Sequence, residues 1–245
     1  MDDTTDSLRE VTLHNGVSMP TLAFGCAFGD WVGATDFQGF LPEQAWHAVT
    51  QALDNGYRAF DGAHVYGTER IVGNVIGQRL ATGELTRDDL FITTKLAHPA
   101  APPHINISHR RTWDPDKVDD IAQRVRDDMV ATLDDLGFGY VDLLLMHWPG
   151  SFGQPTSSDP EFPRKARATI WRTMCELADK GAARAIGVSN FTIDHLRQLS
   201  EDVSDPAYRP AINQVEIHPY CRDPELESFC REHGVCLLYT SDAAD

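Results

Sequence analysis

The stretch from Gly56 to Gly73 reads Gly-Tyr-Arg-Ala-Phe-Asp-Gly-Ala-His-Val-Tyr-Gly-Thr-Glu-Arg-Ile-Val-Gly. Its first half alternates into a short strand that ends at Asp61, and its second half opens a helix near Thr68. Tyr66 therefore lies in the loop beyond the strand end. Such loops, positioned by a rigid scaffold, often carry catalytic side chains.

The same cycle of apolar strand, loop and amphipathic helix continues on both sides of this stretch, which predicts parallel strands with helical crossovers. A doubly wound open sheet and an eight-fold barrel both fit the cycle. The sequence lacks the Gly-x-Gly-x-x-Gly turn that usually follows the first strand of the open sheet, so we favour a barrel. The expected strands are 21–25, 57–61, 90–96, 141–147, 183–188 and 211–217, and the expected helices are 42–55, 69–80, 116–136, 163–180, 193–199 and 224–233.

Two further features suit a barrel. Residues 9–13 and 17–22 flank the turn signal His14-Asn15-Gly16, which predicts a β-hairpin that closes the barrel floor. The long connections follow strand ends, at 26–41, 97–115 and 148–162, and a barrel builds its site from such loops. Residues 98–115 are equally consistent with a lid over the site and with a long surface loop.

Composition limits the classes of partner. The 245 residues are expected to form a flexible leader (1–8) and one domain (9–235), and their formal charge of -16 disfavours nucleic acid and anionic membranes. Five cysteines form no Cys-x-x-Cys pair and show no metal-ligand spacing, so we expect reduced thiols, a cytoplasmic location and no metal. The sequence shows neither a signal peptide nor a membrane span.

Four polar residues lie at strand ends or just beyond them: Asp61, Tyr66, Lys95 and His147. Each alone has a structural explanation, as a buried ion pair, a packed aromatic or a satisfied core histidine. Their shared position favours chemistry, because a barrel brings its strand ends to one mouth. A phenol has a pKa of about 10, which a nearby ammonium lowers. Such a set suits proton delivery to an oxygen that gains charge as hydride reaches a carbonyl carbon.

Four segments occur in order along the chain. They are Gly56-Tyr57-Arg58-Ala59-Phe60-Asp61 with Tyr66, Glu69 and Gly73; Leu136-Gly137 through Val141-Asp142 to His147-Trp148-Pro149; Gly187-Val188-Ser189-Asn190-Phe191; and Asn213-Gln214-Val215-Glu216. Together these segments resemble the aldo-keto reductases. The resemblance implies a (β/α)8 TIM barrel that binds NADPH, with NADH as the alternative, and reduces small aldehydes or ketones to alcohols as a monomer.

The resemblance also implies roles for single residues. Tyr66 would be the general acid, Lys95 and Asp61 its tuning pair, and His147 the group that orients the substrate. The implied cofactor contacts are Gly25, Asp61, Ser189, Asn190 and Gln214, and the implied substrate pocket is Trp31, Val65 and Trp148. Without the resemblance, Ser189-Asn190 is equally explained as a helix N-cap.

Two alternatives remain. The first is a catalytically idle barrel of similar sequence that binds NADPH as a regulatory subunit of a membrane protein, which the presence of all four polar residues disfavours. A different barrel, a lyase or isomerase, would use the Lys95 amine covalently, although a carboxylate partner at Asp61 disfavours the neutral amine that this chemistry needs.

The C-terminus departs from the family pattern. A seventh strand with a Tyr-Ser-Pro-Leu type motif is expected after Val235, but the sequence from Cys236 to Asp245 is Cys-Leu-Leu-Tyr-Thr-Ser-Asp-Ala-Ala-Asp. Our hypothesis is that these ten residues are a transposase-type sequencing adapter translated in frame, which they resemble. We therefore expect a barrel truncated before strand 7, a non-native tail at 236–245, and an inactive fragment that binds NADPH poorly.

Overall fold

The computed structural model describes residues 10–32, 36–39, 41–96, 121–150 and 159–240. Its centre is a curled sheet of seven strands in the order β11-β10-β9-β8-β7-β6-β3, and every neighbouring pair runs parallel. The predicted parallel α/β barrel architecture is thereby confirmed, with β3 and β11 at the two edges of the described sheet. The strands are β3 (Phe24–Gly25), β6 (Ala59–Asp61), β7 (Phe91–Leu96), β8 (Val141–Met146), β9 (Ala183–Ser189), β10 (Ile212–Glu216) and β11 (Cys236–Thr240).

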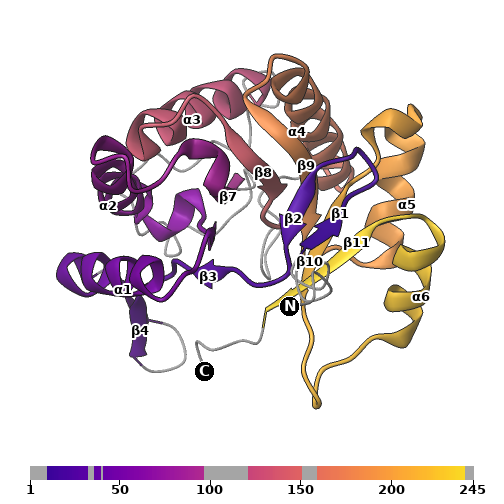
Figure 1. The fold of residues 1–245 in the computed structure, drawn as a ribbon. Helices are drawn as coiled ribbons and strands as arrows, with labels where there is room; N and C mark the ends of the chain where they lie inside the picture. Colours follow the sequence, from indigo (N-terminus) through magenta and orange to yellow (C-terminus); the bar gives the residue numbers. More distant parts are fainter. Residues whose placement is uncertain (1–9, 33–35, 40, 97–120, 151–158, 241–245) are drawn as a thin grey trace, which may run out of the picture.

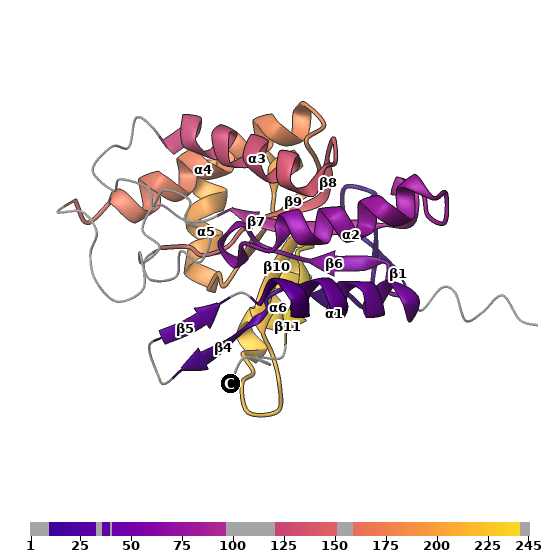
Figure 2. The same ribbon diagram turned by 90° about the vertical axis from the view of Figure 1, so that its left-hand side faces the viewer.

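Six α-helices are described, and Figure 1 shows them in an arc outside the strands. The view turned by 90° in Figure 2 shows α2, α3 and α4 lying over one side of the sheet. None of the described helices is long and apolar enough to cross a membrane. The helices are α1 (Pro42–Asp54), α2 (Glu69–Ala81), α3 (Ile121–Leu136), α4 (Phe162–Asp179), α5 (Ile193–Asp202) and α6 (Pro224–Glu232), with short 3₁₀ turns η1 (His64–Tyr66), η2 (Arg87–Asp89) and η5 (Pro206–Tyr208).

The core has two layers because the central strands bury both of their faces. Outward-facing residues such as Phe60, Leu144 and Ile186 pack with the helices in the larger apolar cluster. Inward-facing residues of the same strands form a smaller cluster inside the curled sheet. This alternation explains why β7 and β8 are buried at every position.

The predicted N-terminal hairpin is present and fills the inner layer. Strands β1 (Glu10–Thr12) and β2 (Ser18–Pro20) pair antiparallel around a turn in which Gly16 has a φ of 85°. Leu13, Val17 and Met19 pack against inward-facing residues near the amino ends of the sheet strands, among them Ala59 and Phe91. The hairpin thus covers the floor, and the opposite edge is left for the site.

A buried carboxylate fixes the order of the central strands. Asp142 on β8 has no exposed surface and accepts hydrogen bonds from Arg87 at 2.7 Å and Arg184 at 2.8 Å. It also accepts the backbone N–H of Ile92 on β7 at 2.8 Å. Because a buried charge is costly without partners, this network ties β8 to both neighbours.

The structure corrects two expectations. Residues 26–41, expected to be a loop, include an antiparallel hairpin of β4 (Gly29–Val32) and β5 (Asp36–Gly39). The sheet was expected to stop before a seventh strand, but Cys236–Thr240 forms β11, in parallel register with Ile212–Glu216. The sequence Cys-Leu-Leu-Tyr-Thr is apolar enough to pair with β10 without the expected motif. The leader and the segment 98–115 lie outside the described residues.

Candidate active site

Side chains alternate between the two faces of each strand, and this alternation places the candidate residues on the inner face of the sheet, at the carboxyl ends of its strands. Ala59, Phe91 and Ile212 face the inner layer near the amino ends of β6, β7 and β10. Steps of two residues from each of them reach Asp61, Lys95 and Gln214 at the carboxyl ends. By the same spacing, Leu145 precedes His147 and Ala185 precedes Ser189. The inner face therefore changes from apolar at the floor to polar at the mouth.

Lys95 and Asp61 form a buried ion pair. The Lys95 Nζ donates to Asp61 Oδ1 at 2.6 Å and to the carbonyl oxygen of Gly62 at 3.0 Å. Burial by itself would lower the pKa of Lys95, but the charges of Asp61 and Tyr66 outweigh it, and the pKa is raised. Lys95 therefore remains an ammonium at neutral pH.

Tyr66 ends the 3₁₀ turn η1, which follows β6 directly and places the ring beside Lys95. The Lys95 Nζ lies 5.1 Å from the centroid of the Tyr66 ring. The surrounding protein raises the pKa of Tyr66 by excluding water, the Lys95 charge lowers it and the Asp61 charge raises it, with a net rise. The ammonium therefore lowers the pKa of Tyr66 as expected from sequence, but desolvation, which the sequence did not reveal, exceeds this effect.

His147 completes the cluster. Its ring lies edge-on to the Tyr66 ring at a centroid distance of 5.7 Å. Burial, followed by the Lys95 charge, holds the pKa of His147 well below its usual 6.5, so the imidazole is neutral. Its Nδ1 is buried without a hydrogen-bond partner among the described residues. A proton on Nε2 leaves only a lone pair unpaired at Nδ1, whereas the other tautomer would leave an unpaired N–H.

Ser189, Asn190 and Gln214 form a hydrogen-bonded group at the ends of β9 and β10. Ser189 Oγ donates to the Gln214 carbonyl oxygen at 2.9 Å, and Asn190 Nδ2 donates to Ser189 Oγ at 3.1 Å. Asn190 Nδ2 also donates to the carbonyl oxygen of His147 at 3.0 Å. Gln214 Nε2 donates to Asp61 Oδ2 at 2.8 Å, so this group is joined to the ion pair.

The remaining candidates lie around this cluster. Gly25 pairs with Asp61 across β3 and β6, and no heavy atom lies within 4 Å of the position that a Cβ would take. Val65 is buried in η1, and the Trp148 ring stacks on His147 at 5.8 Å. The backbone of Trp31 is in β4, but its side chain lies outside the described residues.

Sequence reasoning missed four contacts that hold the site together. The Gly62 carbonyl receives the Lys95 ammonium, and the Gln214 amide reaches Asp61. Cys26 donates its backbone N–H to the Asp61 carbonyl and accepts the Thr68 hydroxyl at its own carbonyl. Backbone groups carry no residue-type signal, so only the position of Cys26 after a strand end pointed to it.

These contacts define a class of protein: an α/β barrel-type fold with a Tyr-Lys-Asp-His cluster at the carboxyl edge of its parallel sheet. The chain matches the Aldo/keto reductase family over residues 6–241. It belongs to that family.

Individual relatives support the same assignment. The chain is 37% identical to aldo-keto reductase family 1 member A1-A of Danio rerio over 90% of its own length and 60% of that protein. It is 30% identical to aldose reductase C of Dictyostelium discoideum, over 97% of its own length and 68% of that protein. It thus spans roughly two thirds or less of these relatives.

Solved structures give the fold independently. A crystal structure of an aldo-keto reductase complexed with NADPH matches with a TM-score of 0.73 and 31% identity, covering 95% of this chain and 62% of that one. An aldo-keto reductase of Bombyx mori in complex with NADP matches with a TM-score of 0.71 and 28% identity, covering 96% of this chain and 66% of that one.

Proposed function

We propose that the protein is an NADPH-dependent oxidoreductase that reduces aldehydes or ketones to alcohols, with Tyr66 as general acid. The observation that carries the proposal is the contact of Lys95 with both Asp61 and Tyr66, beside a neutral His147. Family membership supports the reaction class.

Tyr66 would deliver the proton. Its raised pKa keeps the phenol protonated at neutral pH, as a general acid must be before the reaction. As the carbonyl oxygen gains charge, the phenol gives up its proton, and the Lys95 ammonium stabilises the phenolate that forms. Asp61 holds this ammonium charged and in place. His147 would donate a hydrogen bond from Nε2 to the same oxygen.

The charge on Lys95 also separates this proposal from covalent amine chemistry. A Schiff base requires a neutral amine, whereas the pKa of Lys95 is raised by its partners despite burial. Borohydride trapping of a carbonyl compound on Lys95 would contradict the proposed role.

The residues at the mouth fit a nicotinamide cofactor. Ser189, Asn190 and Gln214 supply the hydroxyl and amide groups that a carboxamide requires, and Gly25 leaves open space beside Asp61. NADPH, when bound, supplies the hydride, and NADH is a second candidate. The NADPH and NADP complexes of related structures support the first choice.

Val65, Trp148 and Trp31 are the proposed lining of the substrate pocket. The stacking of Trp148 on His147 supports its place beside the reacting carbonyl. We further assign the protein a monomeric state and a cytoplasmic location; the formal charge of -16 suits a monomer that stays dispersed.

We also propose that the 245-residue chain binds NADPH weakly and is inactive alone. Its described sheet is open at β3 and β11, and it spans 60% of the Danio rerio relative. Titration with NADPH, followed by tryptophan fluorescence, tests this separately from the reaction. Weak quenching is expected, and tight binding would refute the fragment proposal while leaving the Tyr66 mechanism standing.

The reaction is tested by NADPH oxidation with a panel of aldehydes and ketones, in a protein that carries this chain at the length of its relatives. Carbonyl-dependent oxidation is expected. Tight NADPH binding without turnover of any carbonyl would instead favour an idle regulatory barrel.

A further inference from the structure

Three side chains of metal-binding type converge at the end of β10 and in the turn that follows it, outside the proposed catalytic cluster. One ligand atom each from Glu216, His218 and Cys221 lies within 4.8 Å of the other two. Glu216 and Cys221 are exposed and His218 is half-buried, so the group is accessible from solvent. Figure 1 shows the chain between β10 and α6 extending beyond the neighbouring elements, and Figure 2 agrees.

The backbone holds two of these side chains together. His218 and Cys221 exchange both N–H···O bonds, at 3.0 and 2.9 Å, across the two-residue turn Pro219-Tyr220. Residues paired in this way in an antiparallel bridge project their side chains on the same face. The imidazole and thiol are therefore adjacent before any ligand arrives.

The strand contributes the third side chain. Glu216 is the last residue of β10, two positions after Gln214, so both lie on the same face of the strand. Its Oε1 already lies 2.6 Å from His218 Nε2. A cation between these two atoms would replace the proton that they now share.

We propose that Glu216, His218 and Cys221 form a Zn²⁺ site with three protein ligands and water in the fourth position. A thiolate, an imidazole and a carboxylate are the ligand types that zinc takes in such open sites, whereas Mg²⁺ and Ca²⁺ prefer oxygen alone. Tetrahedral bonds of about 2.0 to 2.3 Å place ligand atoms roughly 3.5 Å apart. The Glu216–His218 pair must open from 2.6 Å and the other pairs lie within 4.8 Å, so only small movements of these side chains are required.

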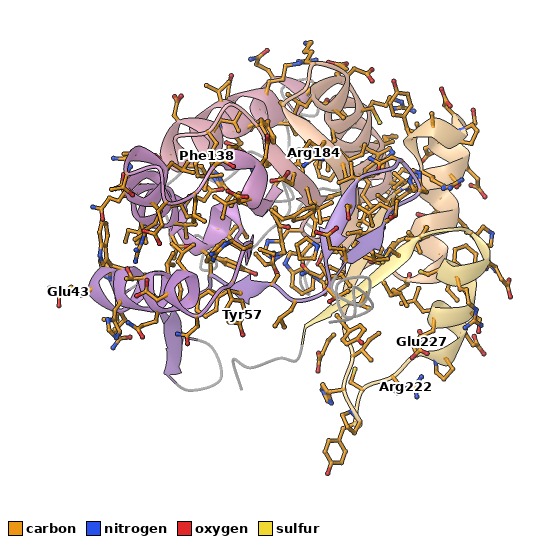
Figure 3. All side chains as sticks on the ribbon, in the orientation of Figure 1. Glu43, Tyr57, Phe138, Arg184, Arg222 and Glu227 are labelled. Atoms are coloured by element: carbon orange, nitrogen blue, oxygen red, sulfur yellow. The ribbon has the colours of Figure 1, made fainter. Side chains whose placement is uncertain are left out.

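The charges around the turn favour a cation. Arg222 is the nearest basic residue in sequence, but its guanidinium binds both oxygens of Glu227, at 2.6 to 3.0 Å. Figure 3 labels this pair at the start of α6. With Arg222 already paired and the whole chain at -16, a divalent ion meets little local repulsion.

Zinc binding has one structural consequence. His218 Nδ1 now accepts the Tyr220 backbone N–H at 3.2 Å, which leaves the ring proton on Nε2. A metal on Nε2 moves that proton to Nδ1, so the Tyr220 N–H must exchange this bond for water. Tyr220 is 98% exposed, so water can accept this N–H. Zinc should therefore accelerate hydrogen exchange at the Tyr220 amide.

The experiment uses the 245-residue protein, freed of metal by chelation. Titration with Co²⁺ identifies the ligands and the coordination geometry. A thiolate ligand gives a near-ultraviolet charge-transfer band, and tetrahedral geometry gives intense visible bands. Zn²⁺ affinity is then measured by competition with a chromophoric chelator. The variants are Glu216→Gln, His218→Asn and Cys221→Ser, and Cys236→Ser is the thiol control.

The proposal expects one zinc ion per chain, a cobalt–thiolate band that disappears in Cys221→Ser, and affinity at least about tenfold weaker in each ligand variant. Cys236→Ser should bind as the wild type does. Circular dichroism checks that each variant is folded. Absence of stoichiometric binding, octahedral cobalt without a thiolate band, or equal affinity in wild type and His218→Asn would each overturn it.

Discussion

Tyr66 is subject to two opposing effects on its acidity. Exclusion of water around the hydroxyl raises its pKa, and the Lys95 charge lowers it, with the first effect larger. The result is a phenol that stays protonated at neutral pH beside a permanent positive charge. This combination suits a group that gives its proton only when negative charge develops nearby.

His147 makes stability depend on pH. Its pKa is lower in the fold than in the unfolded chain, so the unfolded state binds a proton first as the pH falls below about 6.5. Its stabilising contribution is complete above that pH and is lost below it. The free energy of unfolding of the wild type should fall between pH 7 and 5. In His147→Gln this fall should be smaller, by up to about 1.4 kcal/mol per pH unit.

Urea denaturation at several pH values measures this slope. His47→Gln, which removes an exposed histidine on α1, is the matched control. Equal slopes for the wild type and His147→Gln would contradict a buried, neutral histidine.

Residue type and spacing were enough to predict the four catalytic candidates, because polar side chains at strand ends stand out in apolar runs. The Gln214–Asp61 bond was beyond prediction, since side-chain amide orientation depends on the folded mouth. The Glu216, His218 and Cys221 group was missed as well. Its spacing Glu-x-His-x-x-Cys spans the end of a strand and a turn. A search for Cys-x-x-Cys or His-x-x-x-His pairs does not detect this spacing.

At the scale of elements, two glycines of α2 have opposite surroundings. A Cβ on Gly73 would lie 2.3 Å from the carbonyl oxygen of Leu136 at the end of α3, whereas a Cβ on Gly77 would meet nothing within 4 Å. The close approach of α2 to α3 therefore depends on Gly73.

Gly73→Ala should lower the free energy of unfolding by about 1–3 kcal/mol, because backbone must move to admit the methyl group. Gly77→Ala, in the same helix, should raise it by about 0.5–1 kcal/mol through helix propensity. Urea denaturation of both variants provides the comparison. Similar changes of the same sign would show that the α2–α3 contact is looser than described.

The helices and central strands were predictable because α4 repeats apolar residues at the helical period, whereas β8 is a short, nearly continuous apolar run of the kind that forms a strand buried on both faces. The hairpin of β4 and β5 was not, since three glycines among aromatics between 26 and 41 give no alternating pattern. Its pairing depends on tertiary context.

At the scale of the molecule, the edge strand β11 contributes side chains to both layers of the core. Leu237 packs against the outer cluster and Leu238 against the inner one. A chain that ends at Val235 should therefore lose roughly 2–4 kcal/mol of stability and aggregate more readily, because β10 would become an exposed edge.

Thermal unfolding and light scattering test this, with a chain that ends at Thr240 as the control. An unchanged melting temperature after removal of 236–245 would show that β11 contributes nothing. The origin of these residues stays a separate prediction. Recovery of the same ten codons from untagged genomic DNA would contradict an adapter origin.

Fold class followed from the alternation of strands and helices, which leaves few topologies open. The extent of the sheet could not be predicted from the sequence. Cys236–Thr240 pairs with β10 through backbone hydrogen bonds, which almost any apolar segment can make. Pairing of this kind depends weakly on residue identity.

The most direct test of Tyr66 as the proton donor is the rate of carbonyl-dependent NADPH oxidation by the Tyr66→Phe variant, in a protein that carries this chain at the length of its relatives. Loss of the hydroxyl should lower kcat by about 10²–10⁴-fold while NADPH affinity is retained. A Tyr66→Phe variant that turns over at the wild-type rate would contradict the assignment.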